Sequence, residues 1–98
     1  MTINKTQDGG TLVVALEGRL DTTTAPELEA DLKASIDSVT DLVIDMEKLD
    51  YISSAGLRVL LWANKTMNQK GTMVVKNVSE VVNEVFEVTG FADFLTIE

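Results

Sequence analysis

Two short apolar runs flank one amphipathic segment in the middle of the chain, and this arrangement restricts the fold more than any other feature. The runs are DLVIDM, residues 41 to 46, and GTMVVKN, residues 71 to 77. The segment between them, SSAGLRVLLWANKTMNQK, has the length and apolar spacing of a helix. A strand, a crossover helix and a second strand form a right-handed unit with parallel strands. The sequence therefore predicts an α/β domain.

The N-terminal part of the chain adds a hairpin and a helix to this unit. Residues 2 to 6 lead through a turn with two glycines into the apolar run TLVVALEG, residues 11 to 18. Thr24, Pro26 and Glu27 then predict a helix start with a capping box. The buried stripe of this helix is expected at Leu28, Leu32 and Ile36, and its acidic residues are expected to face water.

The C-terminal part predicts a third helix and a short last strand. Ser79 is expected to cap the helix, and Gly90 to end it in a left-handed conformation. Val82, Val85 and Phe86 form its apolar stripe. Three residues are expected to pin the tail to the core: Phe91, Phe94 and Ile97. Residues 94 to 97 are expected to form a short edge strand.

These elements occur in the order β-β-α-β-α-β-α-β, which predicts one compact domain over residues 1–98 with helices packed against a mixed sheet. No internal repeat or linker interrupts the chain. Partners of such sheets usually meet the loops at the carboxyl ends of the parallel strands. The stretch DYISSAGLR, residues 50 to 58, is expected in such a loop.

Composition excludes several classes of function. The chain has no cysteine and no histidine, which removes thiol nucleophiles and the commonest general base and metal ligand. Its net charge is -8, and its eight basic residues are scattered, so we expect no binding to nucleic acids or to anionic membranes. No apolar run approaches the ~20 residues that span a bilayer, and no leader follows Met1, so we expect a cytoplasmic protein. The charge also favours a monomer in the free state.

The serine pair at residues 53 and 54 invites three chemical interpretations. A nucleophilic serine needs a base, and Lys48 in the same acidic loop is expected to stay protonated, so catalysis is disfavoured. The stretch SSAGLR lacks the glycine spacing of a nucleotide-binding loop. A magnesium site on Asp21, Asp45 and Asp50 has suitable ligands but no phosphate-binding loop beside it. We therefore expect neither a metal nor a cofactor.

Helix capping and phosphorylation fit the same stretch better. One of Ser53 and Ser54 is expected to cap the helix, which leaves Gly56 unexplained because glycine in a first turn costs up to ~1 kcal/mol relative to alanine. Its missing side chain indicates a close approach, either by the neighbouring strand loop or by another molecule. A phosphoserine at a helix N-terminus is electrostatically favourable, so the loop is suited to accept phosphate.

The motifs resemble a known family. LDYISSAGLRVLL resembles the signature loop of STAS domains, the sulfate transporter and anti-sigma factor antagonist family, and specifically of free-standing bacterial anti-anti-sigma factors. LEGRLDTTTAPELEADL resembles the family's first strand-loop-helix, and GTMVVKNVSEVVNEVFEVTGFADFLTI its closing half. The resemblance extends over essentially the whole chain.

The resemblance implies a phosphorylation-controlled protein switch without enzymatic activity. It implies that the unphosphorylated form binds an anti-sigma factor that is also a serine kinase and thereby frees a sigma factor, and that a PP2C-type phosphatase restores this form. Alignment on Gly56 and Leu57 makes Ser54 the matching acceptor, with Ser53 as a minor alternative. Ser53 stands where the family often has aspartate, and Ala55 where it often has serine or threonine. Asp21 matches the family's first-loop aspartate.

Two residues of the central helix remain open at this stage. Trp62 either packs beneath the third helix, which we favour, or anchors a partner. Arg58 could pair with Asp21 or with an attached phosphate. The expected partner-binding set is Asp21, Ser53, Ser54, Ala55, Gly56, Leu57, Arg58 and Trp62.

Two other functions remain as alternatives to the switch. The domain could serve as a STAS scaffold or interaction module of a larger assembly, in which the serine is only a cap. It could also bind a small molecule or nucleotide at the same loop, which only the fold class supports.

Overall fold

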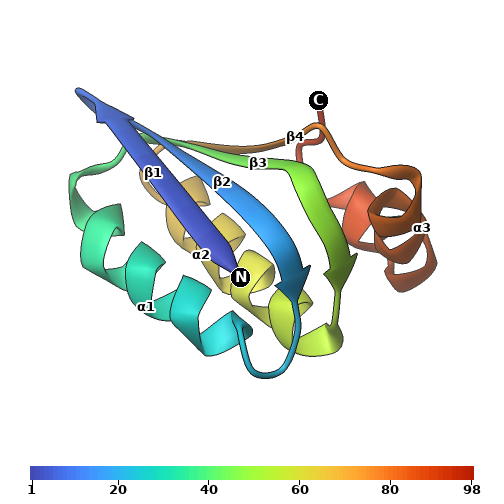
Figure 1. The fold of residues 1–98 in the computed structure, drawn as a ribbon. Helices are drawn as coiled ribbons and strands as arrows, with labels where there is room; N and C mark the ends of the chain where they lie inside the picture. Colours follow the sequence, from blue (N-terminus) through green and yellow to red (C-terminus); the bar gives the residue numbers. More distant parts are fainter.

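A four-stranded sheet is the scaffold of the computed structural model, which describes residues 1–98 (Figure 1). β1 (Thr2–Asp8) and β2 (Thr11–Leu20) form an antiparallel hairpin. β2, β3 (Asp41–Ile52) and β4 (Thr72–Lys76) are parallel, and the strand order is β1-β2-β3-β4. The hairpin and the parallel crossover unit are therefore confirmed, as is the mixed sheet.

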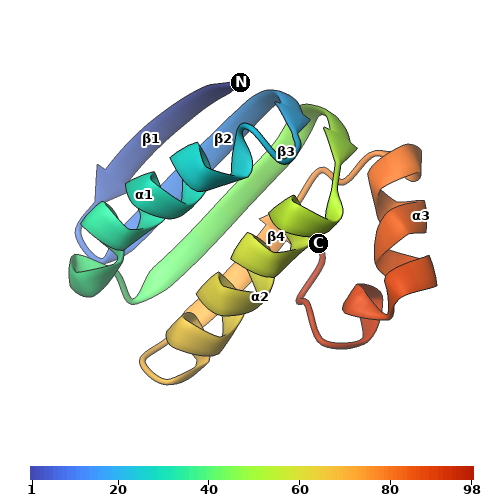
Figure 2. The same cartoon turned by 90° about the horizontal axis from the view of Figure 1, so that it is seen from below.

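Two helices cover one face of this sheet. α1 (Ala25–Ser35), which continues into the 3-10 turn η1 (Ile36–Ser38), lies beside α2 (Ser54–Asn68), as seen from below in Figure 2. α3 (Glu80–Thr89) stands apart from them at the edge of the domain and packs against β3 and the 3-10 turn η2 (Phe91–Asp93). No helix is long and apolar enough to cross a bilayer.

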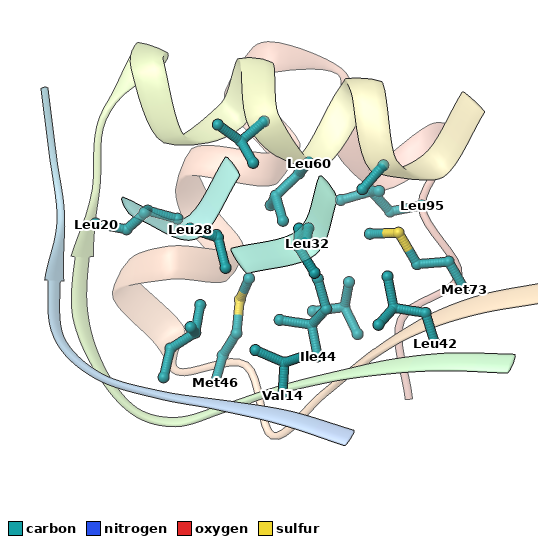
Figure 3. Packing of buried hydrophobic residues seen from close by; sticks show 14 of the residues in the cluster. Val14, Leu20, Leu28, Leu32, Leu42, Ile44, Met46, Leu60, Met73 and Leu95 are labelled. Atoms are coloured by element: carbon teal, nitrogen blue, oxygen red, sulfur yellow. The ribbon is translucent and has the colours of Figure 1, made fainter. Parts of the chain in front are cut away.

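The core lies between the sheet and the two covering helices. Leucines of α1 and α2 meet β-branched residues of the strands there, as Figure 3 shows for Leu28, Leu32 and Leu60 against Val14 and Ile44. All five side chains are fully buried. At roughly 1.5–3 kcal/mol for each such side chain, this packing is the main term that holds α1 and α2 on the sheet.

β3 is longer than the sequence pattern indicated. We predicted a strand that ends near Met46, but β3 continues to Ile52. The pairing with β2 shifts register twice, and β3 contributes the extra residue each time, between Ala15/Glu17 and between Gly18/Arg19 of β2. Bulges break the alternation of period two, so the buried residues of this part lie three apart. The stretch DYI therefore belongs to the strand and not to a loop.

The C-terminal segment differs in detail from the prediction. The last strand is reduced to one parallel bridge between Val75 and Ile97. Phe91 and Ile97 pack against the core as predicted, and Leu95, only 6% exposed, is a further anchor of the tail. Phe94 is 41% exposed, and its ring lies 4.7 Å from that of Phe91 instead of entering the core. The expectation that Phe94 pins the tail was wrong, because Leu95, and not Phe94, points into the core after the 3-10 turn η2.

Candidate functional site

The carboxyl ends of β2 and β3 bring the two predicted site segments together. Leu20 and Ile52, the last residues of the two strands, are register partners. The N–H of Ser53 then donates to the carbonyl of Leu20 at 2.9 Å. The segments that follow β2 and β3 therefore leave the sheet at the same end of the strands (Figure 1).

The two serines have different tasks. Ser53 is the N-cap of α2, with extended backbone angles, and its hydroxyl accepts a hydrogen bond from the N–H of Gly56 at 3.4 Å. Ser54 is the first helical residue and is exposed, and its hydroxyl makes no hydrogen bond within the chain. The capping role falls to Ser53, so Ser54 carries the free hydroxyl of the pair.

The first turn of α2 also leaves two backbone donors without a partner. The N–H of Ser53 is bound to Leu20, and that of Gly56 to the cap. The amides of Ser54 and Ala55 remain, as expected for the first turn of a helix. They lie at the positive end of a fifteen-residue helix, where a negative group is stabilised by typically 0.3–1 kcal/mol.

Gly56 is explained by the sheet beneath it. A Cβ atom on this residue would lie 2.7 Å from Cγ of Leu20 and 3.0 Å from Cγ1 of Ile52. The sequence left open whether a neighbouring strand or another molecule approaches Gly56. The ends of β2 and β3 make this approach, and their side chains leave no room for a Cβ atom. This close contact seats the start of α2 directly on the ends of β2 and β3, and so fixes the position of Ser54.

Asp21 organises the loop after β2. One carboxylate oxygen, Oδ1, accepts hydrogen bonds from the backbone N–H groups of Thr23 and Thr24, each at 3.0 Å, and from the hydroxyl of Thr23 at 2.8 Å. The predicted capping box was wrong, because the Thr24 side chain caps nothing in α1. Its hydroxyl donates to the carbonyl of Arg19 at 2.7 Å instead. Asp21 satisfies the amides of the turn that leads into the helix.

The same hydrogen bonds stabilise the charged form of Asp21. The hydroxyl of Thr23, the N–H of Thr24 and the N–H of Thr23, in that order, lower the pKa of Asp21 from 3.8 to about 2. The carboxylate is therefore ionised throughout the physiological pH range. Asp21 contributes a fixed negative charge beside the serines and cannot act as a general base near neutral pH.

A cation–π pair that the sequence did not reveal lies next to Asp21. The guanidinium of Arg19 lies 4.2 Å from the ring centroid of Tyr51, its register partner on β3. Nε of Arg19 is also 3.9 Å from Oδ2 of Asp21. Of the two partners considered for Arg58, Asp21 is therefore paired with Arg19 instead, which precedes it by two residues at the end of β2. Only knowledge of the strand register could have found this pair.

Arg58 lies instead at a shallow cleft between the first turns of α1 and α2. The cleft has a volume of about 280 Å³. Arg58 is exposed and forms no ion pair. The residues that line the cleft are Thr22, Ala25, Pro26, Glu29, Ala55, Arg58 and Val59. Ala55 lines this cleft as well, and the residues that α1 contributes were not anticipated from the sequence.

Other members of the predicted binding set lie beneath or beside this surface. Leu57 is 6% exposed and belongs to the core, so it supports the surface from below, as Gly56 does. Trp62 is half-buried, and Nζ of Lys33 lies 5.6 Å from its ring centroid. Because Lys33 belongs to α1, the tryptophan faces that helix, and the expectation that it packs beneath α3 was wrong.

The three aspartates considered as magnesium ligands do not form one cluster. Asp45 pairs with Ala15 in the middle of the sheet, whereas Asp21 follows the end of β2. A hydrogen bond from Asn77 is the main cause that lowers the pKa of Asp45, and the N–H of Glu47 adds to it. No group of three or more acidic residues lies close enough to hold a metal ion.

Comparison of the sequence with those of known proteins identifies its relatives. The STAS domain family matches residues 2–98. A Bordetella bronchiseptica protein named "Putative anti-sigma factor antagonist BtrV" is 40% identical over 90 residues, which is 90% of this chain and 78% of that protein. An anti-sigma-B factor antagonist of Staphylococcus aureus is 31% identical over 86 residues, which is 86% of this chain and 80% of that protein.

Solved structures show the same fold. An anti-sigma factor antagonist from Mycobacterium paratuberculosis superposes with a TM-score of 0.88 at 26% identity, over 98% of this chain and 83% of that one. The unphosphorylated form of the anti-sigma factor antagonist SpoIIAA has a TM-score of 0.86 at 22% identity, over 99% of this chain and 88% of that one. The phosphorylated form of the Bacillus cell fate determinant SpoIIAA has a TM-score of 0.79 at 21% identity, with coverage of 99% and 91%.

Proposed function

We propose that this chain, which belongs to the STAS domain family, is an anti-sigma factor antagonist controlled by phosphorylation of Ser54. Unphosphorylated, it binds an anti-sigma factor that is also a serine kinase, and a sigma factor is released. The names of the Bordetella and Staphylococcus relatives support the antagonist role. The existence of SpoIIAA in phosphorylated and unphosphorylated forms supports the switch.

The state of the Ser54 hydroxyl is the observation that carries this proposal. The hydroxyl of Ser53 is engaged by the N–H of Gly56, whereas that of Ser54 is exposed and free. A kinase can reach Ser54 without breaking a cap, which typically contributes ~1 kcal/mol to a helix. The structure thus offers a physical reason for choosing Ser54 over its neighbour.

The chemistry of the switch requires no catalytic group in this chain. The Oγ of Ser54 forms a bond to the γ-phosphorus of ATP, ADP leaves, and the hydroxyl proton passes to the kinase. Hydrolysis by a PP2C-type phosphatase returns the hydroxyl and inorganic phosphate. The chain itself is a substrate and a ligand in this scheme. It acts in the cytoplasm as a monomer that alternates between two partners.

Phosphate changes the charge of the docking surface and leaves the fold in place. It adds roughly 1.5 to 2 negative charges at pH 7. The free amides of Ser54 and Ala55 and the positive end of α2 stabilise these charges within the chain. Arg58 lies one helical turn after Ser54 and has no ion pair, so it can approach the phosphate from the same helix face. A partner surface that accepts the hydroxyl must then accommodate an added dianion, and this weakens the complex.

The proposal is tested with three baits in lysate of the native host: the wild type, Ser54→Ala and Ser54→Asp. A kinase-fold protein retained by the first two is then purified and titrated against each of them by calorimetry. We expect similar affinities for the wild type and Ser54→Ala, and an affinity at least tenfold lower for Ser54→Asp. Incubation of the purified kinase with ATP should place one phosphate on the wild type.

Ser53→Ala is the matched control, because it removes the neighbouring hydroxyl and leaves Ser54 intact. This variant should still accept phosphate, while Ser54→Ala should accept none. Equal kinase affinity for the Ser54→Ala and Ser54→Asp variants would refute the switch. Phosphate found on Ser53 by mass spectrometry would move the switch to the capping residue. Retention of the same proteins by all three baits would favour the scaffold role.

A further inference from the structure

Exposed apolar side chains gather on α3, at the edge of the domain. Val81 is 59% exposed and Val88 is 81% exposed, which are the highest values among the large hydrophobic residues. With the half-buried Val85 they follow the spacing i, i+4, i+7, so they lie on one face of the helix. This face lines a groove of about 320 Å³ together with Glu84 and Thr89. Val82 and Phe86 point the other way, into the core.

The charged residues of the segment that carries this valine face have a single sign. The segment from residue 77 to residue 98 contains no lysine or arginine. Its acidic residues are all exposed, and none of them takes part in an ion pair. They are Glu80, Glu84, Glu87, Asp93 and Glu98. These five residues supply more than half of the net charge of -8.

We propose that the valine face of α3 is a second protein-binding surface, and that its occupant is an amphipathic helix whose apolar stripe is flanked by lysine or arginine. The i, i+4, i+7 spacing is that of a helix–helix seam, which fixes the shape of the occupant. The unpaired glutamates fix its charge. In a dimer through this face, the acidic residues of one copy would face those of the other and repel them. An anionic membrane would be repelled for the same reason. The valines extend over only two helical turns, so the complex is small and short-lived.

The probe for this surface is a synthetic helical peptide with a leucine seam flanked by lysines, compared with the same peptide flanked by glutamates. Binding to the full chain is followed by methyl NMR of its valines. We expect saturable shifts at Val81, Val85 and Val88 with the lysine peptide, and at least tenfold weaker binding of the glutamate peptide. Val88→Ser should weaken binding of the lysine peptide at least fivefold without moving the thermal midpoint, because the side chain is exposed.

Two charge variants form a matched pair for this test. Glu84→Lys and Glu27→Lys change the net charge equally, but only Glu84 lies at the groove. The first should weaken binding of the lysine peptide several-fold and the second should not. Equal effects of the two variants, equal affinity of the two peptides, or shifts spread over the sheet would overturn the proposal. Sedimentation of the protein alone, and with vesicles of anionic lipid, tests the other occupants: self-association or vesicle binding that Val88→Ser abolishes would also overturn it.

The surface is independent of the phosphorylation switch. Ser54→Asp should leave binding of the lysine peptide unchanged, because Ser54 does not line the groove. If Ser54→Asp fails to alter binding of the anti-sigma factor, the proposed function falls while the α3 surface stands. If the peptide fails to bind, the converse holds.

Discussion

Gly56→Ala tests the contact that seats the functional serine on the sheet. The new methyl carbon would lie 2.7 Å and 2.9 Å from Cγ and Cδ2 of Leu20, and 3.0 Å from Cγ1 of Ile52. Leu20 is fully buried, and Cγ is not the mobile end of its side chain. Relief of the overlap therefore requires a shift of α2 away from the strand ends or a strained rotamer of Leu20.

Two opposing effects set the magnitude. Overpacking of a filled core typically costs about 1–3 kcal/mol. Alanine in place of glycine in a helix returns up to about 1 kcal/mol. The expected net loss of stability is about 1 kcal/mol, which for a domain of this size corresponds to a decrease in Tm of roughly 4–8 °C.

Urea denaturation of a double-mutant cycle separates these effects. Leu20→Ala removes the atoms that the new methyl group meets, at a cost of about 2–5 kcal/mol. In that background Gly56→Ala should be neutral or stabilising, which corresponds to a coupling free energy of about 1–2 kcal/mol. Ala30→Gly, at an exposed position of α1, gives the propensity term alone.

The reasoning fails if Gly56→Ala stabilises the protein by the full propensity term in the wild-type background. It also fails if the effects of Gly56→Ala and Leu20→Ala are additive. Either result would mean that the strand ends do not fix the start of α2, and the need for glycine would then have to come from a bound partner.

The remaining predictions concern the switch serine and the residues beside it. The carboxylate of Asp21 should titrate near pH 2 by NMR, and Thr23→Val should raise this midpoint toward 3.8. Because the pKa of Asp21 is lower in the folded state than in the unfolded state, the ionised carboxylate stabilises the fold. This stabilisation should be complete above about pH 4 and lost as the pH falls toward 2. A stability difference between wild type and Asp21→Asn that stays constant over this pH range would contradict the prediction. Ser53→Ala should lower the free energy of unfolding by about 0.5–2 kcal/mol in urea titrations, since it removes the cap of α2. Ser54→Ala should leave this free energy within about 0.5 kcal/mol of wild type, because the residue is exposed, and an equal loss for both variants would contradict the assigned roles.

Local signals predicted most of the fold and failed where tertiary pairing overrides them. Apolar periodicity located the helices and the parallel crossover unit. Ser79 caps the start of α3 and Gly90 its end, as expected. The extension of β3 to Ile52 was missed, because bulges against β2 remove the period-two pattern on which strand prediction depends. Thr24 stands at the predicted cap position, yet Asp21 takes the amides of the preceding turn. A residue pattern does not reveal which of two neighbouring oxygen-bearing side chains will reach those amides.

The sequence by itself determined the order of elements, the absence of thiol and imidazole chemistry, the acidic surface and the stretch that holds the serine pair, because these depend on residue identity and local spacing. Only the tertiary structure decided which serine caps the helix and which is free, since this depends on where the end of β2 receives the N–H of Ser53. It also paired Arg19 with Tyr51 and left the valines of α3 uncovered. These features result from strand register and from the position of α3 on the domain, which are set by contacts between segments distant in the chain.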